Sequence, residues 1–574
     1  MNCRFLLAVL LQYQLLLFCF ASANSYESDD IDNADRQLDL ATEDHTLQLR
    51  LGTGHGTSSD DFAADAMLVD PLDELRKALE IMQNTWFKVW IGTWPTAIDW
   101  TRAVLDTYLV SALSSLSKAL PSSQQQREIE NEINLYFSQN VAYYFGENAF
   151  SLRNQAYDDM LWVVLGWLES VKFIKKHSQL HYQPADKDSQ SPSWHGSQFI
   201  QAFAHRARVF YDITTRGWDT KFCGGGMTWN PSLGPYKNAI TNELFIAASV
   251  DGMQQQDLGK ATPQDPSYLE AAIDGYDWLK NSNMTNAQGL YVDGFHILNW
   301  RKNGTKCDER NNMVYTYNQG VLLSGLRGLW ESTGNKMYLQ DGHQLVRNVI
   351  STTGWLSETG KAPNSYIWAG LGRNGILEDA CDASGHCDQN AQTFKGIFFH
   401  HLTLFCDPLP FVALVPGKTH VADKELAFLH RQSCKRYAHW VAHNAKAALS
   451  TRDEKGRFGM WWAPQSVDNV APLPEGAIDY RTNAWEVLTP LWLSRSGPLW
   501  SDAIASYGNG QVLNANGRVR TATDPHEAGV MSDKSHEDST MSSDPNDRGR
   551  GRTVETQGGG VAVLRALWEL LNTP

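Results

Sequence analysis

The stretch from Tyr157 to Glu169 constrains the fold of this chain more than any other part of its sequence. Two adjacent carboxylates, Asp158 and Asp159, stand at its start, and the apolar residues that follow would cover every face of a helix. A helix that is apolar all round is a buried one, and burying ionised carboxylates is costly unless something compensates. We therefore expect both aspartates on the first turn of a buried helix, where the helix dipole favours negative charge and the helix opens on a cavity.

This pair of carboxylates has a chemical consequence. Two close carboxylates cannot both ionise easily, so one stays charged while the other can hold a proton. Cleavage of a glycosidic bond by an acid and a nucleophile requires such a pair. A structural interpretation stands beside this one, because an Asp-Asp at a helix start is most often an N-cap followed by an acid that the dipole favours. The pair alone does not distinguish an enzyme from a capped helix.

Helical periodicity continues along most of the chain. Apolar residues recur at three- and four-residue steps, alternation typical of strands is scarce, and loops rich in Gly and Trp, such as residues 218–229, 289–294 and 456–462, separate the runs. A returning loop type between helix pairs indicates repeated αα-hairpins, and about twelve helices in such pairs can close into a double-layered ring. We therefore expect an all-α protein, an (α/α)6 toroid of helical hairpins. The predicted helical runs are residues 72–110, 129–145, 157–175, 199–214, 239–253, 268–282, 314–333, 338–352, 392–405, 424–449, 484–492 and 561–571.

The two ends of the chain differ in composition from the helical part. The first 23 residues combine a basic residue, an apolar run and a small-x-small ending, which is typical of a secretory signal peptide. The residues after them are acidic with little periodicity, which is typical of a disordered leader. The predicted parts are a signal peptide at 1–23, a leader at 24–69, the helical toroid at 70–505, a disordered insertion at 506–553 and a helix that closes the toroid at 554–574.

Charge and hydropathy exclude several classes of partner. No later stretch reaches the 18 apolar residues of a membrane span, and the terminal helix carries Arg565 and Glu569, unlike the uninterrupted apolar tail of a GPI signal. The net charge of −15 disfavours nucleic acid. We expect a secreted monomer, extracellular or associated with a cell wall, that spans no membrane and binds no nucleic acid.

The cysteines fit secretion. The chain has 8 cysteines, of which Cys3 and Cys19 lie in the predicted signal peptide. An even number in an oxidising compartment suggests disulfides, and Cys381 and Cys387 are close enough in sequence to close a small loop. A zinc site is the alternative, although no Cys-x-x-Cys or paired His spacing supports it. The cysteines that remain are Cys223, Cys307, Cys381, Cys387, Cys406 and Cys434.

Three other sequence features do not by themselves identify a function. Adjacent His400 and His401 would diverge on a helix, so they indicate surface or core imidazoles, and we expect no metal and no cofactor. Asn283 and Asn303 begin glycosylation sequons. The 21 tryptophans suit either a large core or the apolar faces of sugar rings.

Polar side chains recur where other apolar helices begin. Asn242, Asn318 and Lys395 each enter an apolar run near its start. Capping explains any one such residue. Together with the aspartates, they give four buried helices that present polar groups at the end that a toroid would direct into one cavity.

In their order along the chain, the motifs resemble glycoside hydrolase family 76, the α-1,6-mannanases, in its fungal form. The resemblance covers roughly residues 85–500 and the terminal helix. It implies an (α/α)6 toroid without a metal, retaining cleavage of α-1,6-mannan backbones, Asp158 as the nucleophile and Asp159 as the acid/base. The motifs are residues 157–159 with the Trp-rich helix, 237–245 (KNAITNELF), 289–294 (GLYVDG), 315–320 (YTYNQG) and 394–397 (FKGI).

The spacing of adjacent aspartates agrees with this chemistry. A retaining enzyme needs carboxyl groups about 5–5.5 Å apart, and neighbours on one helical turn can reach that spacing by rotamer choice. An inverting pair, at roughly 6.5–9.5 Å, is harder to build from adjacent residues. The candidates for sugar stacking are Trp94, Trp229, Tyr317 and the pair Trp461 and Trp462, and the candidates for contacts to sugar hydroxyls are Asn242, Asn318 and Lys395.

Three functions remain open from the sequence. The first is an endo-acting hydrolase of α-1,6-mannan. The second is a cell-wall transglycosidase acting on mannose-containing GPI glycans, because a sugar can take over a covalent intermediate as water does; the absence of a GPI tail favours hydrolysis. The third is a wall-binding protein without catalysis, which has no reason to retain two charges at the start of a buried helix.

Overall fold

The computed structural model describes residues 70–120, 126–182, 193–254, 266–356, 367–463, 470–480 and 544–572. The predicted signal peptide, the acidic leader, the helix at 484–492 and residues 506–543 of the predicted insertion lie outside the described residues.

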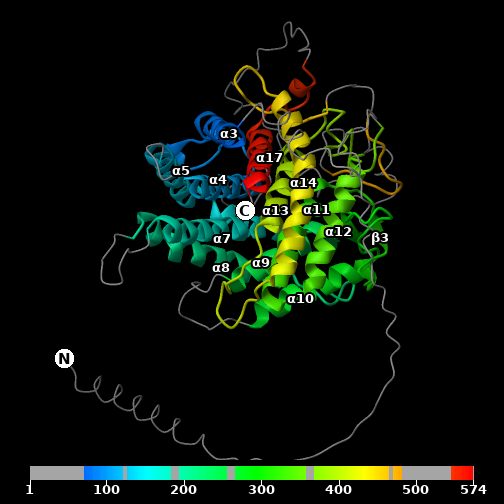
Figure 1. Ribbon diagram of the computed structural model, residues 1–574. Coiled ribbons are helices and arrows are strands. Elements are labelled where there is room, and N and C mark those ends of the chain that lie inside the picture. The colour runs from blue at the N-terminus through cyan, green and yellow to red at the C-terminus, as the bar shows by residue number, and fades with distance from the viewer. Residues whose placement is uncertain are drawn as a thin grey trace, which may run out of the picture. The chain divides into compact units, whose positions relative to one another are not determined.

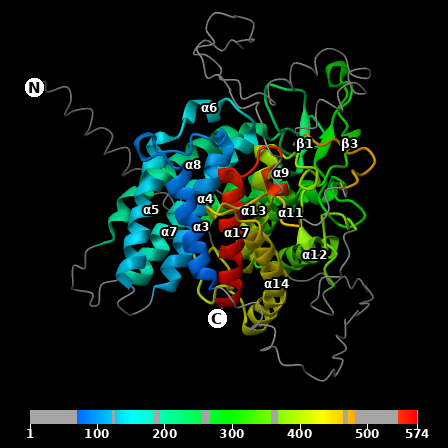
Figure 2. The same ribbon diagram turned by 90° about the horizontal axis from the view of Figure 1, so that it is seen from above.

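Six of the described helices form a closed inner ring (Figures 1 and 2). The first five pack against one another in chain order. The sixth, near the end of the chain, packs against both the fifth and the first, so it closes the ring. These helices have no solvent face, because each meets two neighbours, an outer helix and the ring interior. The inner helices are α4 (Asp99–Ala119), α7 (Tyr157–His181), α9 (Ala239–Gln254), α11 (Thr316–Thr333), α13 (Gln389–Cys406) and α17 (Val554–Asn572).

Six outer helices pack on the inner helices and make the second layer, with α3 and α14 both packed mainly on α17. They bury one stripe instead of all faces: α12 buries Leu339, Leu345, Val346 and Val349, while its polar residues face solvent. The all-α architecture of paired helices is therefore confirmed. The outer helices are α3 (Pro71–Trp86), α5 (Gln126–Gly146), α8 (Ile200–Thr214), α10 (Pro266–Asn281), α12 (Lys336–Thr352) and α14 (Lys424–Ser450).

Short strands occur in the connections that lead into the inner helices. β2 pairs antiparallel with both β1 and β3, with Tyr236 opposite His296 and Gly294 opposite Asn311. These pairings fix the loops before α9 and α11. The strands are β1 (Tyr236–Asn238), β2 (Gly294–His296), β3 (Glu309–Asn311), β4 (Gly372–Arg373) and β5 (Ile376–Leu377), and the short helices are η1 (Val89–Ile91), α6 (Ala149–Arg153), η2 (His195–Phe199), η3 (Thr215–Gly217), η4 (Trp300–Lys302) and η5 (Pro545–Asp547).

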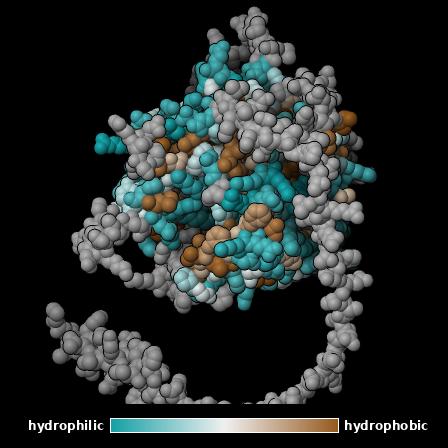
Figure 3. All heavy atoms as spheres, in the orientation of Figure 1, coloured by the Kyte–Doolittle hydropathy of each residue, from teal (hydrophilic) through white to brown (hydrophobic). Residues whose placement is uncertain are grey.

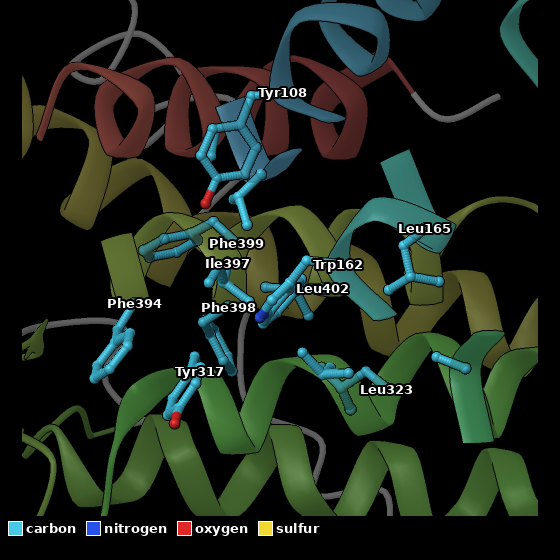
Figure 4. Packing of buried hydrophobic residues seen from close by; sticks show 14 of the residues in the cluster. Tyr108, Trp162, Leu165, Tyr317, Leu323, Phe394, Ile397, Phe398, Phe399 and Leu402 are labelled. Atoms are coloured by element: carbon cyan, nitrogen blue, oxygen red, sulfur yellow. The ribbon is translucent and has the colours of Figure 1, made fainter. Parts of the chain in front are cut away.

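Apolar side chains fill the interior of the ring. Figure 4 shows Trp162, Tyr317 and Phe398 among the side chains that meet between the inner helices. The backbones come close at Gly396, where a Cβ would lie 2.9 Å from the Cα of Gly559 on α17. Small residues at such crossings let α13 and α17 pack directly on one another. The face of the molecule in Figure 3 has small hydrophobic groups separated by hydrophilic ones.

Ion pairs join the inner helices near their C-terminal ends. Lys172 of α7 lies 2.7 Å from Asp251 of α9, and Lys118 of α4 lies 2.8 Å from Glu569 of α17. Cations near helix C-termini also interact favourably with the helix dipole. The two ends of the ring therefore differ in charge arrangement, with the Asp158–Asp159 pair at the opposite end.

The predicted disulfides form in the structure. Cys381 pairs with Cys387 and closes the small loop expected from their spacing. Cys223 pairs with Cys307, and Cys406 pairs with Cys434. Along the described part of the chain, no helix combines the length and apolarity that a membrane crossing needs.

Candidate active site

Asp158 and Asp159 occupy the first turn of α7, with 5% and 8% of their surfaces exposed. The N-cap position belongs to Ala156, which makes no side-chain cap. The aspartates therefore do not serve as the N-cap, which was the structural alternative from the sequence. Their position places two acids where the dipole of a buried helix favours negative charge.

Two N–H groups donate to the carboxylate of Asp158. The indole Nε1 of Trp229 lies 3.1 Å from Oδ2, and the backbone N of Asp159 lies 3.1 Å from Oδ1. Hydrogen bonds of this kind favour the charged form of a carboxylate. The Trp229 carbonyl also accepts the Tyr157 N–H at 2.8 Å, so this loop is held against the start of α7 at two points. Trp229, a candidate for sugar stacking, is half-buried and contacts the candidate nucleophile directly.

Asn242 is a structural clamp, and its prediction as a sugar ligand is wrong. Its side chain is fully buried, with Oδ1 accepting the Met227 N–H at 2.7 Å and Nδ2 donating to the carbonyls of Asn238 and Met227 at 2.7 and 3.3 Å. The amide thus holds both backbone groups of one loop residue to the first turn of α9. No side-chain polar atom of Asn242 is left for a sugar hydroxyl.

The same clamp recurs on α11. Oε1 of Gln319 accepts the Tyr291 N–H at 2.8 Å, and Nε2 donates to the carbonyls of Tyr291 and Tyr315 at 2.9 and 3.0 Å. This role was not predicted, although the sequence places an amide residue near the start of both apolar helices, each preceded by a Gly-rich loop. In both helices, the amide side chain near the helix start therefore holds the loop that precedes the helix.

Four of the five aromatic candidates are packed in the protein interior, so their prediction as stacking platforms is wrong. Trp94 is fully buried, where its indole N–H donates to Gln83 at 3.0 Å and its ring packs on Phe87. Tyr317 is 3% exposed, and its ring stacks on Phe394 with centroids 3.9 Å apart (Figure 4). Neither ring offers a free face to a sugar.

The Trp461 and Trp462 pair is also buried, with 2% of each residue exposed. The Trp461 indole donates to Glu378 at 3.1 Å, and the Trp462 indole donates to the Gly459 carbonyl at 3.2 Å. Both rings therefore belong to the core around α13 and α17. The large tryptophan count reflects core packing at these positions.

Lys395 forms a buried ion pair, so its prediction as a contact to sugar hydroxyls is wrong. It is 2% exposed, its Nζ lies 2.5 Å from Oδ2 of Asp382, and its charge lies 5.4 Å from the Trp462 ring centre. An ammonium in the interior needs such a counter-charge. Asp382 belongs to a loop that the sequence analysis did not single out.

That loop carries two further buried acids. Asp379 accepts the N–H and the hydroxyl of Thr316 at 2.9 and 2.8 Å, so it fixes the start of α11. Glu378 pairs with Arg373 at 3.0 Å, and burial raises the pKa of Glu378 to about 8. Burial, together with the neighbouring Asp382, also raises the pKa of Asp379. The signal in the sequence was the concentration of acids directly before α13.

Several buried side-chain groups of the described residues make no hydrogen bond. Among them are the amide of Asn318 on α11 and the carboxyl of Glu243 on α9, and both residues are fully buried. Burial, with a contribution from the charge of Asp293, raises the pKa of Glu243 well above its usual value. The contact of Asn318 with a sugar remains a prediction.

The remaining sequence candidates are two sequon asparagines and two adjacent histidines. Asn283 and Asn303 are exposed and have left-handed backbone conformations, with φ of 58° and 67°. Their glycosylation remains a prediction. His400 and His401 are buried, and burial lowers the pKa of both imidazoles well below the usual value.

Two groups of side chains in the described part of the chain have metal-ligand spacing. Both depend on a cysteine that is in a disulfide, Cys434 in one and Cys381 with Cys387 in the other. A disulfide sulfur does not supply the thiolate that binds a metal. At the start of α7, the described groups are two carboxylates and the N–H groups of Trp229 and Asp159.

Comparison with known proteins gives a consistent set of relatives. A family model described as glycosyl hydrolase family 76 matches residues 93–477. The chain is 28% identical over 214 residues to mannan endo-1,6-alpha-mannosidase DFG5 of Saccharomyces cerevisiae, covering 35% of this chain and 39% of that protein. It is 24% identical over 360 residues to the DFG5 protein of Candida albicans, covering 60% of this chain and 66% of that protein. The chain thus spans less than two thirds of the length of these curated relatives.

Solved structures of similar proteins have low sequence identity to this chain. An inactive variant of the alpha-1,6-mannanase GH76A of Salegentibacter sp. HEL1_6, in complex with alpha-1,6-mannotetrose, is 15% identical with a TM-score of 0.49, covering 88% of this chain and 100% of that chain. Dfg5 from Chaetomium thermophilum, in complex with glucosamine, is 15% identical with a TM-score of 0.43, covering 82% of this chain and 96% of that chain.

Proposed function

This chain belongs to glycoside hydrolase family 76, and we propose that it is an endo-1,6-α-mannosidase that cleaves α-1,6-mannan backbones by a retaining double displacement. The observation that carries the proposal is the pair of adjacent aspartates on the first turn of α7, with Asp158 held by the Trp229 indole. The names of the curated relatives support the same substrate class.

The contacts of Asp158 suit a nucleophile. N–H groups of Trp229 and Asp159 donate to its carboxylate and orient it for attack on the anomeric carbon. Asp159 would protonate the departing glycosidic oxygen in the first step and take a proton from water in the second. This assignment requires carboxyl groups about 5–5.5 Å apart when a sugar is bound.

Substitution of each aspartate tests the proposal. Asp158→Asn should abolish the release of reducing ends from α-1,6-mannan. Asp159→Asn should lower the rate about 10²–10⁴-fold by removing general acid–base catalysis. With an aryl α-mannoside whose leaving group needs no protonation, added azide should restore turnover of Asp159→Asn and give a mannosyl azide of retained configuration. Asp341→Asn on the outer helix α12 is the matched control and should act as the wild type.

Three outcomes separate the proposed activity from its alternatives. Transfer products without new reducing ends would assign the chain to transglycosidases that act on mannose-containing GPI glycans. Unchanged behaviour of folded Asp158→Asn would assign it to wall-binding proteins without catalysis. A mannosyl azide of inverted configuration would contradict the double displacement.

We further propose that the protein is secreted and acts as a monomer on α-1,6-mannan or a related mannose-containing cell-wall glycan. The signal-peptide pattern of residues 1–23 supports secretion. Protein recovered from the medium of expressing cells should begin at Asn24, as determined by N-terminal sequencing. Retention of the full chain inside the cells would contradict this part of the proposal.

A further inference from the structure

Five exposed apolar side chains lie on η1, at the end of α5 and on α6, the segments that precede α4 and α7. Trp90, Phe145 and Phe150 have 80%, 76% and 79% of their surfaces exposed, and Val89 and Ile91 have 62% and 44%. We call these five residues the rim patch. In Figure 2, α6, which carries Phe150, lies at the end of the ring opposite the C-terminus of α17. Grouped exposed apolar side chains indicate a binding surface.

Close backbone contacts bring two parts of the rim patch together. A Cβ on Gly146 would lie 2.3 Å from the carbonyl oxygen of Ile91, and one on Gly92 would lie 2.2 Å from the carbonyl oxygen of Ala142. The η1 turn therefore lies directly on the last turn of α5. Trp90 and Phe145 each lie within two residues of this contact, so their side chains belong to one local surface.

Hydrogen bonds connect the segment that carries the third aromatic residue to the start of α4. Asp99, the first residue of α4, accepts from Ser151 at 2.6 Å and from Gln155 at 2.8 Å. Ser151 adjoins Phe150, and Gln155 lies in the segment that leads into α7. Phe150 precedes Asp158 by eight residues, so at most about 27 Å of extended chain separates them. The patch is thus held at a fixed place on the rim of the candidate site.

We propose that the rim patch binds sugar units of the α-mannan chain that extend beyond those at the catalytic aspartates; this inference rests on the proposed function. A pyranose ring has an apolar CH face that packs on an aromatic ring, and a neutral polysaccharide needs no charged partner. Three aromatic side chains on one rigid rim supply such faces. The net charge of −15 makes an anionic membrane surface a poor occupant.

The double variant Trp90→Ala with Phe150→Ala tests this proposal. Initial rates are measured against concentration for long α-1,6-mannan and for α-1,6-mannotetraose. We expect the KM for the polymer to rise about tenfold through the loss of two contact faces, while kcat and both constants for the tetraose stay at wild-type values. Phe411→Ala is the matched control, because Phe411 is 64% exposed on the connection after α13, at the other end of the ring. Phe411→Ala should leave KM and kcat at wild-type values for both substrates.

The outcomes distinguish failure of this proposal from failure of the proposed function. An unchanged KM for the polymer, or an equal change for both substrates, would overturn the rim patch as a mannan site. If the wild type cleaves neither substrate, retention on an immobilised α-1,6-mannan column decides: equal retention of the wild type and the double variant overturns the patch, and selective loss in the double variant supports it. Wild-type partitioning into phosphatidylcholine vesicles that the double variant loses would assign the patch to lipid and overturn the proposal.

Discussion

Replacing Asn242 by leucine separates the clamp seen in the structure from the sugar contact expected from the sequence. Leucine has a similar size and fits an apolar surrounding, but it removes the acceptor of the Met227 N–H and the donor to the Met227 carbonyl. Met227 is fully buried, so water cannot replace these partners. Each buried polar group left without a partner costs about 1–3 kcal/mol.

The two backbone groups together give an expected loss of about 2–6 kcal/mol in the free energy of unfolding. This loss is a large part of the roughly 5–15 kcal/mol of a typical domain. The variant should also lose activity, because the loop that contains Met227 continues to Trp229, which holds Asp158. We therefore expect a lower kcat on α-1,6-mannan together with the lower stability.

Urea-induced unfolding followed by tryptophan fluorescence measures the first effect, and reducing-end release measures the second. Gln319→Leu should lose a similar free energy, because Gln319 clamps Tyr291 in the same way. Gln344→Leu is the control, because Gln344 is an exposed amide on α12 and should change stability by less than about 0.5 kcal/mol. If Asn242→Leu keeps its stability and only raises KM, Asn242 is a sugar ligand and the clamp argument is refuted.

Three other substitutions test the buried charges and the indole. Because burial raises the pKa of Glu243 above its usual value, the folded protein retains a proton that the unfolded chain releases above about pH 4.5. The wild type therefore loses stability relative to Glu243→Gln as the pH rises from 5 to 8, by about 1.4 kcal/mol per pH unit until the folded carboxyl ionises. Urea unfolding at each pH measures this difference in stability. A difference that does not change with pH would contradict the prediction. Asp382→Asn leaves the Lys395 ammonium buried without its partner and should lower the free energy of unfolding by about 3–5 kcal/mol in the same assay. Adding Lys395→Met should recover part of this loss. No loss of stability in Asp382→Asn would show that the pair is solvated. Trp229→Phe keeps an aromatic ring but removes the N–H that donates to Asp158, so kcat should fall about tenfold or more. A change in KM alone would indicate sugar stacking.

The fold could be predicted because the sequence pattern of a helix reflects how many of its sides are covered. The helix after Asp159 is apolar all round and is an inner helix, whereas α12 has one apolar stripe and is an outer helix. The Gly- and Trp-rich loops between the helical runs marked the hairpin connections. The short strands β1 to β5 were not predicted, because two- or three-residue pairings in Gly-rich loops have no periodicity to detect.

The position of the two aspartates on the first turn of a buried helix could be predicted, but the partners of the neighbouring polar side chains could not. Asn242 lies on the first turn of α9 and Lys395 on the second turn of α13, yet one side chain points back to its own loop and the other to Asp382. Sequence spacing gives the position of a residue along a helix but not the side toward which a side chain near the helix start bends. A long cation and a short amide can each be satisfied by the preceding loop or by a ligand, and only the contacts decide.

The contacts around α7 and α9 also connect stability with chemistry. Asn242 on α9 fixes Met227, the loop beyond Met227 carries Trp229, and Trp229 donates to Asp158 on α7. The position of the candidate nucleophile thus depends on a neighbouring helix as well as on its own. A ring of inner helices makes this arrangement possible, because the loop before each helix lies against the start of the previous one. The Gly- and Trp-rich loops between the helices are therefore the segments that hold the carboxylates in a fixed position relative to the ring.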